Sequence, residues 1–429
     1  MLLNTTDSKI DKPMSDSSET AESAIQPVHH AWATSDTRKS NVQKILKQLE
    51  IKNIKASFVK KIEATRTEAY LFELSEENLG DIFKLNGNFG KILDMALKTS
   101  GISVVAPVPD TSQIAVIVPK KNSGMVRIEP FIEKIKSGNY RIPCVLGEDY
   151  LGNPVVIDLA TCQHQLIGGA TGSGKSNLIK AIIAGISLGC SPRDVKLLVI
   201  DGKGLDFCIF NGIKHLLHPV VTEMEETITT LQWLTQEMDR RVEAFKKAST
   251  YDIWAYNDKM LAKKRKWDKI LPALVVIIDE VQVFASAGDK IFEKLLLKLT
   301  QKGRAIGIVM ILATQRPSVD ILQGSIKTNL PGRVALRLPS QIDSRVILDQ
   351  NGAEFLKNKG DLLVIQTTLE NGLRLQAPYL NDEFSGYTSN TIKISSKKSM
   401  NLAFSSRRFY HLFMKIFRTC KFIDNNHHG

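Results

Sequence analysis

The chain has 429 residues, of which 43% are hydrophobic and 24% are charged, an ordinary balance for a globular protein with a sizeable core. No run approaches the roughly 18 apolar residues of a transmembrane helix, and the polar N-terminus lacks a signal-peptide pattern, so we expect neither a membrane-spanning nor a secreted protein. The five cysteines form no CxxC pair and no metal-binding spacing, which favours a cytoplasmic location.

The net charge of +12 is concentrated near the C-terminus. Residues 391–429 carry eight Lys and Arg against one acid, a net charge of +7, whereas residues 1–40 carry four bases against six acids, a net charge of −2. A basic tail favours nucleic acid or an anionic membrane surface as a partner, although many such tails only aid solubility. The charge is therefore weak support for a nucleic-acid partner.

The chain begins with a segment that we expect to be disordered. Residues 1–40 are rich in Ser, Thr, Asp, Glu and Pro and have too few large apolar side chains to offset the entropy of ordering. Residues 41–140 alternate helical and strand-like apolar spacing, which predicts a small α+β domain. The helical patterns cover 42–49 and 90–97, and the strand-like runs cover 54–59, 69–74, 102–105 and 114–119.

Residues 141–383 predict an α/β fold. Apolar strands are expected before residue 169 and at 195–201, 274–280 and 308–314, with helical segments between them. Continuous apolar strands separated by helices indicate a mostly parallel sheet covered on both faces. The predicted fold class is therefore a RecA-like P-loop NTPase core, preceded by the small α+β domain.

Residues 384–429 are expected to form a basic tail with an amphipathic helix. Residues 409, 412, 413, 416, 417 and 420 are apolar and lie on one face of a helix. Three interpretations stay open: a helix that packs on the core, a helix for a partner or a membrane surface, with peripheral contact through 405–423, and a nucleic-acid arm.

A phosphate-binding motif lies at the centre of the predicted core. It has the pattern G-x-x-x-x-G-K-[ST], in which backbone N–H groups converge on the phosphates, the lysine neutralises β/γ charge and the Ser hydroxyl can bind Mg²⁺. A Gly/Ser-rich linker turn is the alternative, but an apolar strand before the motif and a helical pattern after it favour an ATP site. The residues are Gly169, Ala170, Thr171, Gly172, Ser173, Gly174, Lys175 and Ser176.

An acidic strand end completes the predicted ATP site. The apolar run at 275–278 ends in Asp279 and Glu280, as in a Walker B strand. Asp279 would bind Mg²⁺, and Glu280 would polarise the attacking water. Gln315, directly after the fourth strand, is placed to sense a γ-phosphate. Solvated acids and an ordinary polar residue at strand ends are the plainer alternatives.

Several longer motifs resemble the FtsK/SpoIIIE DNA translocases. The most specific is the nonapeptide at 312–320, Leu-Ala-Thr-Gln-Arg-Pro-Ser-Val-Asp, and the resemblance covers about residues 41–380. It implies a homohexameric ring that hydrolyses ATP between subunits and moves double-stranded DNA through its pore. Where the family usually has Asp-Glu-Phe-Ala-Asp, this chain has Asp279-Glu280-Val281-Gln282-Val283, and where the family has Ile-Asp-Pro-Lys it has Ile200-Asp201-Gly202-Lys203.

The resemblance also implies roles for single residues. Arg304 matches the arginine finger that reaches a neighbouring subunit's nucleotide, although its position alone favours a surface arginine at a helix end. Arg316, Lys327 and Arg345 match pore-loop positions that contact the DNA backbone. Phosphate contacts of this kind make binding tolerant of sequence and sensitive to salt.

A basic run at 259–269 lies beside aromatic residues and could bind nucleic acid, or could form a solvated helix and loop.

The sequence therefore predicts an ATP- and Mg²⁺-dependent double-stranded DNA translocase that acts in DNA segregation or in plasmid or mobile-element transfer. It resembles a short member of the family, in which we expect neither a membrane anchor nor a DNA-reading winged-helix domain. Two alternatives remain: a secretion-system ring ATPase that moves protein, and a nucleotide-dependent DNA-binding scaffold that does not translocate.

Overall fold

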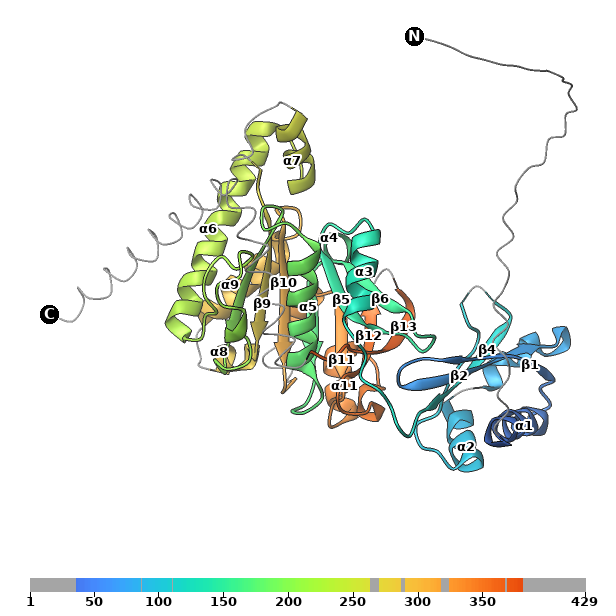
Figure 1. The fold of residues 1–429 in the computed structure, drawn as a ribbon. Coiled ribbons are helices and arrows are strands. Elements are labelled where there is room, and N and C mark those ends of the chain that lie inside the picture. The colour runs from blue at the N-terminus through green and yellow to red at the C-terminus, as the bar shows by residue number, and fades with distance from the viewer. Residues whose placement is uncertain are drawn as a thin grey trace, which may run out of the picture.

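The computed structural model describes residues 36–85, 87–109, 111–262, 270–286, 290–317, 324–366 and 369–380. The N-terminal segment up to residue 35, residues 263–269 of the basic run and the C-terminal tail lie outside these ranges. The described residues form a four-stranded and a nine-stranded sheet, each with its own helices (Figure 1). None of the helices in these ranges is both long and apolar enough to cross a membrane.

The four-stranded sheet belongs to the small N-terminal domain and is antiparallel, in the order β1-β2-β4-β3. Its core includes Ile45, Phe72 and Leu93. Helix α1 begins at Asp36, so its first turn lies in the segment predicted to be disordered; this turn is polar and carries no apolar periodicity. The elements are α1 (Asp36–Ile51), β1 (Ala56–Glu63), β2 (Thr67–Leu74), η1 (Glu76–Lys84), α2 (Gly87–Leu97), β3 (Ser103–Val105) and β4 (Gln113–Pro119).

The nine-stranded sheet has the order β6-β5-β13-β12-β11-β7-β10-β9-β8. The half from β11 to β8 is parallel, as predicted for a RecA-like core, but the half from β6 to β12 pairs antiparallel. The short connection between β5 and β6 can make only a hairpin, because a parallel crossover needs a longer segment. The strands are β5 (Pro143–Glu148), β6 (Pro154–Asp158), β7 (Gln165–Gly168), β8 (Val195–Asp201), β9 (Ala273–Asp279), β10 (Ile308–Thr314), β11 (Gly332–Leu336), β12 (Asp361–Gln366) and β13 (Leu369–Gln376).

Helices cover both faces of the parallel strands. In β9, Val276 and Ile278 pack in one apolar core with α6 and α9, whereas Val275 and Ile277 pack in another with α5. This alternation follows from the two-residue period of a strand and gives three layers. The helices are α3 (Glu129–Ser137), α4 (Leu159–Cys162), α5 (Lys175–Gly189), η2 (Cys208–Phe210), α6 (Met224–Ala248), α7 (Ile253–Ala262), α8 (Val281–Ser286), α9 (Lys290–Lys302), α10 (Gly324–Thr328), α11 (Gln341–Leu348) and η4 (Ala353–Phe355).

Helix α3 indicates the position of the boundary between the two domains. Its apolar residues Phe131 and Ile135 share a core with Val145 of β5 and Ala181 of α5, all in the large domain. The small sheet ends with β4, so residues 120–128 connect the two domains. We therefore propose that the division lies before α3 rather than at residue 140.

Arg241 in α6 is fully buried and ties this helix to two strand ends. Its guanidinium donates to Oε1 of Glu237 at 2.8 Å and to the carbonyl oxygens of Ile306 and Pro272, each at 2.9 Å. Burial raises the pKa of Glu237, but the hydrogen bond from Arg240 and the charges of both arginines outweigh it and hold the pKa below its usual value. Glu237 is thus a buried carboxylate that depends on its arginines.

We expect Arg241→Ala to lower the free energy of unfolding by about 3–5 kcal/mol, because it leaves a buried charge without its buried partner. Arg240→Ala is the matched control, since it removes the second partner of the same carboxylate. The Arg240 side chain is 43% exposed, so the loss should stay below about 1 kcal/mol. Urea unfolding of the two variants measures both values, and equal losses would contradict this assignment.

Candidate active site

The predicted phosphate-binding loop, residues 169–176, connects the end of β7 to the start of α5. The strand and helix predicted on either side of it are both present. Gly174 has a φ of +104°, and a Cβ there would lie 2.7 Å from the backbone nitrogen of Gly360, so only glycine fits. The same nitrogen donates to the carbonyl oxygen of Ser173 at 2.7 Å. A segment distant in sequence thus supports the loop.

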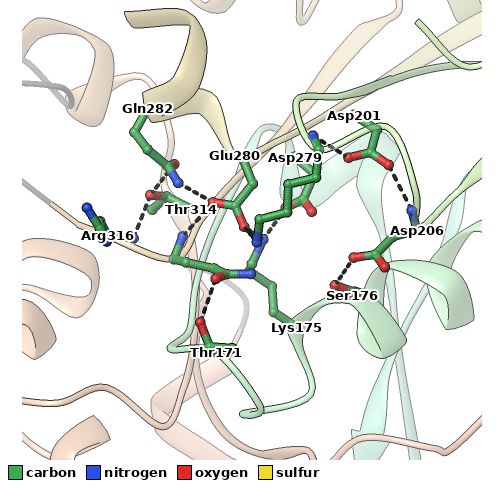
Figure 2. A network of polar contacts seen from close by, with 12 residues as sticks. Thr171, Lys175, Ser176, Asp201, Asp206, Asp279, Glu280, Gln282, Thr314 and Arg316 are labelled. Atoms are coloured by element: carbon green, nitrogen blue, oxygen red, sulfur yellow. Dashed lines mark hydrogen bonds and ion pairs between the residues drawn. The ribbon is translucent and has the colours of Figure 1, made fainter. Parts of the chain in front are cut away.

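Lys175 meets both predicted acidic residues at the end of β9. Its ammonium is buried and pairs with the carboxylates of Asp279 and Glu280, at 3.3 Å from Oε1 of Glu280 (Figure 2). Lys175 and Asp279 are 104 residues apart in sequence. They meet because β7 and β9 both lie beside β10 and run parallel to it, so their carboxyl ends share one edge of the sheet.

Glu280 is fixed by several polar groups around it. Lys203 Nζ lies 2.7 Å from its Oε1, the backbone nitrogen of Gln315 donates to Oε2 at 3.2 Å, and the Gln282 amide also donates to Oε2. Burial raises the pKa of Glu280, but the hydrogen bond from Lys203 and the charge on Lys175 outweigh it, so the pKa lies below its usual value. The result is an ionised, oriented carboxylate, which suits the polarisation of a water molecule.

The residues around Asp279 fit a magnesium ion that is bound together with nucleotide phosphates. Its Oδ2 is buried without a hydrogen-bond partner in the described part of the chain, and a cation or a cation-bound water would satisfy such an oxygen. Burial raises the pKa of Asp279, and the Lys175 ammonium opposes this rise. The Ser176 hydroxyl donates to Asp206 at 2.7 Å.

No cluster of three or more His, Cys, Asp or Glu side chains in the described ranges could hold a metal alone. Phosphate oxygens and water would therefore supply the remaining ligands.

Gln315 lies beside the phosphate-binding loop. Thr171 Oγ1 donates to its side-chain oxygen at 2.8 Å. Gln315 also lines a cavity of about 560 Å³ together with Lys175 and Ser176. Its backbone nitrogen contacts Glu280, so Gln315 lies between the loop and this carboxylate.

Arg304 lies at the opposite edge of the sheet from the loop. It precedes β10, and the other end of β10 borders the loop, where Gly169 donates to the carbonyl oxygen of Thr314 at 3.2 Å. At about 3.3 Å per residue, this strand separates Arg304 from its own loop by about 20 Å. The side chain is exposed, and in the amide orientation that satisfies both groups the Gln163 oxygen accepts from its guanidinium at 2.6–3.0 Å. Arg304 therefore cannot reach its own nucleotide site.

The three basic residues predicted to contact DNA have different environments. Arg316 and Arg345 are exposed, and Arg345 donates to Asn351 at 2.8 Å. Lys327 instead pairs with Asp349 at 2.6 Å and donates to the carbonyl oxygen of Arg345 at 3.2 Å. Lys327 is thus held within the fold at the C-terminus of α11, whereas the two arginines are accessible.

The polar contacts around Lys175, Asp279 and Glu280 also involve residues to which the sequence analysis assigned no role. They include Gln282, whose side-chain oxygen accepts from Thr314 at 2.7 Å, and Asp206, which is oriented by a backbone hydrogen bond to Asp201 (Figure 2). The sequence did indicate that Lys203 could lie near the site. Lys203 follows the apolar strand β8, which ends in Asp201 and pairs with β9. Nothing in the sequence pattern indicated that Gln282 would orient Glu280.

This chain is similar in sequence to known proteins. Residues 132–319 match the model of the FtsK/SpoIIIE family. The chain is 40% identical over 298 residues to the DNA translocase FtsK of Clostridium acetobutylicum, an alignment that covers 69% of this chain and 39% of the relative. It is 35% identical over 363 residues to the DNA translocase SftA of Bacillus subtilis, covering 84% of this chain and 38% of the relative. The chain thus spans about two fifths of the length of these relatives.

Solved structures share the fold. The pCW3 conjugation coupling protein TcpA, in a monomer form with ATPγS, aligns with a TM-score of 0.57 and 22% identity over 83% of this chain and 99% of that one. The cytoplasmic domain of the type VII secretion ATPase EccC of Thermomonospora curvata aligns with a TM-score of 0.55 and 23% identity over 63% of this chain and 34% of that one. The family match includes the phosphate-binding loop and the acidic end of β9, so residues 132–319 form an FtsK/SpoIIIE-type domain.

Proposed function

We propose that this protein is an ATP-driven double-stranded DNA translocase that works as a ring, with six subunits as the resemblance implies. The observation that carries the proposal is the meeting of Lys175, Asp279 and Glu280 at one edge of the parallel sheet. Relatives that are 35–40% identical are DNA translocases, and TcpA is a conjugation coupling protein. These names favour DNA segregation or the transfer of a plasmid or mobile element. We place this activity in the cytoplasm.

Each residue of the site has a chemical task in this proposal. Backbone N–H groups of residues 169–174 and the Lys175 ammonium hold the phosphates. Ser176 and Asp279 hold Mg²⁺, which neutralises phosphate charge when bound. Glu280 orients and polarises the attacking water, and Gln315 senses the γ-phosphate.

The position of Arg304 supports a shared active site. An exposed arginine about 20 Å from its own loop can act on phosphate only if another subunit presents that phosphate. A finger supplied across an interface stabilises the charge on the transferring phosphoryl group. A ring in which every subunit contributes a loop and a finger meets this condition.

Phosphate contacts by Arg316 and Arg345 would let the motor run over any DNA sequence. We expect Arg345→Ala to weaken duplex DNA binding equally for unrelated sequences and to reduce the salt-dependence slope by about 1, since one phosphate contact is lost. Lys327→Ala is the matched control: it should lower stability through the lost contact with Asp349 and change the slope little. Fluorescence anisotropy across a salt series measures both, and an unchanged slope for Arg345→Ala would refute the contact.

The decisive experiment measures the ATPase rate with and without linear duplex DNA across a series of protein concentrations. A ring translocase should be stimulated several-fold by DNA, with a rate per subunit that rises with concentration. The non-translocating scaffold would be favoured if the ATPase rate changes neither with DNA nor with protein concentration but is lost in Lys175→Ala. Stimulation by a protein substrate instead of DNA would favour the secretion-type alternative, whose fold EccC shares.

A further inference from the structure

The cavity beside the phosphate-binding loop is shared between the two domains. Lys175 and Ser176 line it from the large domain, and Arg66 lines it from the turn between β1 and β2 of the small domain. Residues 123–126 of the interdomain connection form another part of its wall. A ligand bound to the loop would therefore contact both domains.

The lining of this cavity suits an anion. It includes the cations Arg66, Lys175 and Lys359, and no Asp or Glu is among the described residues that line it. Arg66 Nη1 donates to the carbonyl oxygen of Lys359 at 3.1 Å. A guanidinium has five N–H donors, so this hydrogen bond leaves others that can bind phosphate.

The turn that carries Arg66 is attached to the large domain close to the loop. The neighbouring Thr65 donates through its backbone nitrogen and its hydroxyl to both carboxylate oxygens of Glu148, at 2.8 and 2.7 Å. Gly360, which follows the residue that Arg66 contacts, donates to the carbonyl oxygen of Ser173 at 2.7 Å. Arg66 is thus connected to the phosphate-binding loop through Lys359 and Gly360.

Two large side chains with apolar surface form another part of the cavity wall. Met125 and Tyr379 both line it and are 69% and 51% exposed. Asn177, at the start of α5, accepts from the backbone nitrogen of Leu380 at 2.9 Å, and the backbone nitrogen of Tyr379 donates to the carbonyl oxygen of Val126 at 2.9 Å. Large apolar side chains that are exposed in a cavity can receive a flat ring such as a nucleobase.

We propose that Arg66 contacts the phosphate chain of an ATP held by the loop, and that Met125 and Tyr379 hold the base of the same ATP. The small domain then forms part of the nucleotide site. This inference rests on the proposed ATP binding. Its consequence is that bound ATP strengthens the contact between the two domains and that its release weakens the contact.

The test titrates a fluorescent ATP analogue into the full chain and its variants. Arg66→Ala should raise the dissociation constant about tenfold, as expected for a lost hydrogen bond to a charged group. Arg66→Gln can still donate to the Lys359 carbonyl, and it should weaken binding similarly because it lacks the charge. Lys60→Ala, an exposed cation on the same hairpin outside the cavity, should bind as the wild type does.

Hydrogen exchange adds a readout that is independent of affinity. ATPγS should slow amide exchange at residues 64–67 in the wild type and in Lys60→Ala, but not in Arg66→Ala measured at saturating nucleotide. Wild-type affinity and protection in both Arg66 variants, with binding lost in Lys175→Ala, would overturn the inference and leave the ATP site intact. If Lys175→Ala binds as tightly as the wild type, the proposed ATP site itself fails, and this inference fails with it.

Discussion

Replacing Arg304 with alanine should reduce the DNA-stimulated ATPase rate by about 10³-fold while ATP affinity stays unchanged, because a finger acts on the transition state and not on the bound ground state. The structural reason is the sheet: Arg304 and the phosphate-binding loop lie at opposite ends of β10. Lys302→Ala is the matched control, since it removes an exposed cation at the end of α9. Steady-state ATPase rates, together with nucleotide titrations, give both quantities.

Mixing two inactive variants tests whether Arg304 acts on a neighbour. Lys175→Ala keeps the finger but loses the phosphate-binding loop, and Arg304→Ala keeps the loop but loses the finger. In mixed rings, a Lys175→Ala subunit can supply its finger to the loop of an Arg304→Ala neighbour, so activity should return on mixing. If the mixtures stay as inactive as the separate variants, Arg304 does not act across an interface.

Replacing Glu280 with glutamine should slow ATP hydrolysis by about 10²–10⁴-fold and leave ATP binding intact, because an amide cannot polarise the attacking water as a carboxylate does. Removing the Glu280 charge also frees Lys175 from one of its two ion pairs. Gln282→Ala provides the comparison, since it removes only one hydrogen bond that orients Glu280; we expect a loss below about tenfold. A near-wild-type rate in Glu280→Gln would exclude this carboxylate from the chemistry.

The pH dependence follows from the same environment. The pKa of Glu280 lies below its usual value, since Lys203 and Lys175 outweigh the effect of burial. The carboxylate therefore stays ionised above that pKa, and the rate should fall only when the pH drops through it. The hydrolysis rate should show no titration of Glu280 between about pH 5 and pH 8. An inflection in that range that disappears in Glu280→Gln would contradict this result.

The sequence by itself determined the phosphate-binding loop, the acidic end of β9 and the RecA-like core. These features depend on local chemistry: glycines where backbone nitrogens converge, a lysine and a hydroxyl at a helix start, and apolar strands that end in acids. Because parallel strands end at a common edge, the meeting of Lys175 with Asp279 was also predictable. The small domain was recognisable from alternating helical and strand-like spacing.

Only the tertiary structure decided which partners lie beside these motifs. Half of the large sheet is antiparallel, because the hairpins β5–β6 and β12–β13 pair with each other and with β11. These pairings depend on packing between distant segments and not on a local sequence pattern. Lys327 is paired with Asp349, and Lys203 and Gln282 hold Glu280, through contacts between segments that have no fixed spacing in the chain. Arg66 lines the cavity beside the phosphate-binding loop for the same reason: the packing of two domains, and not the local sequence, brings its turn to the loop.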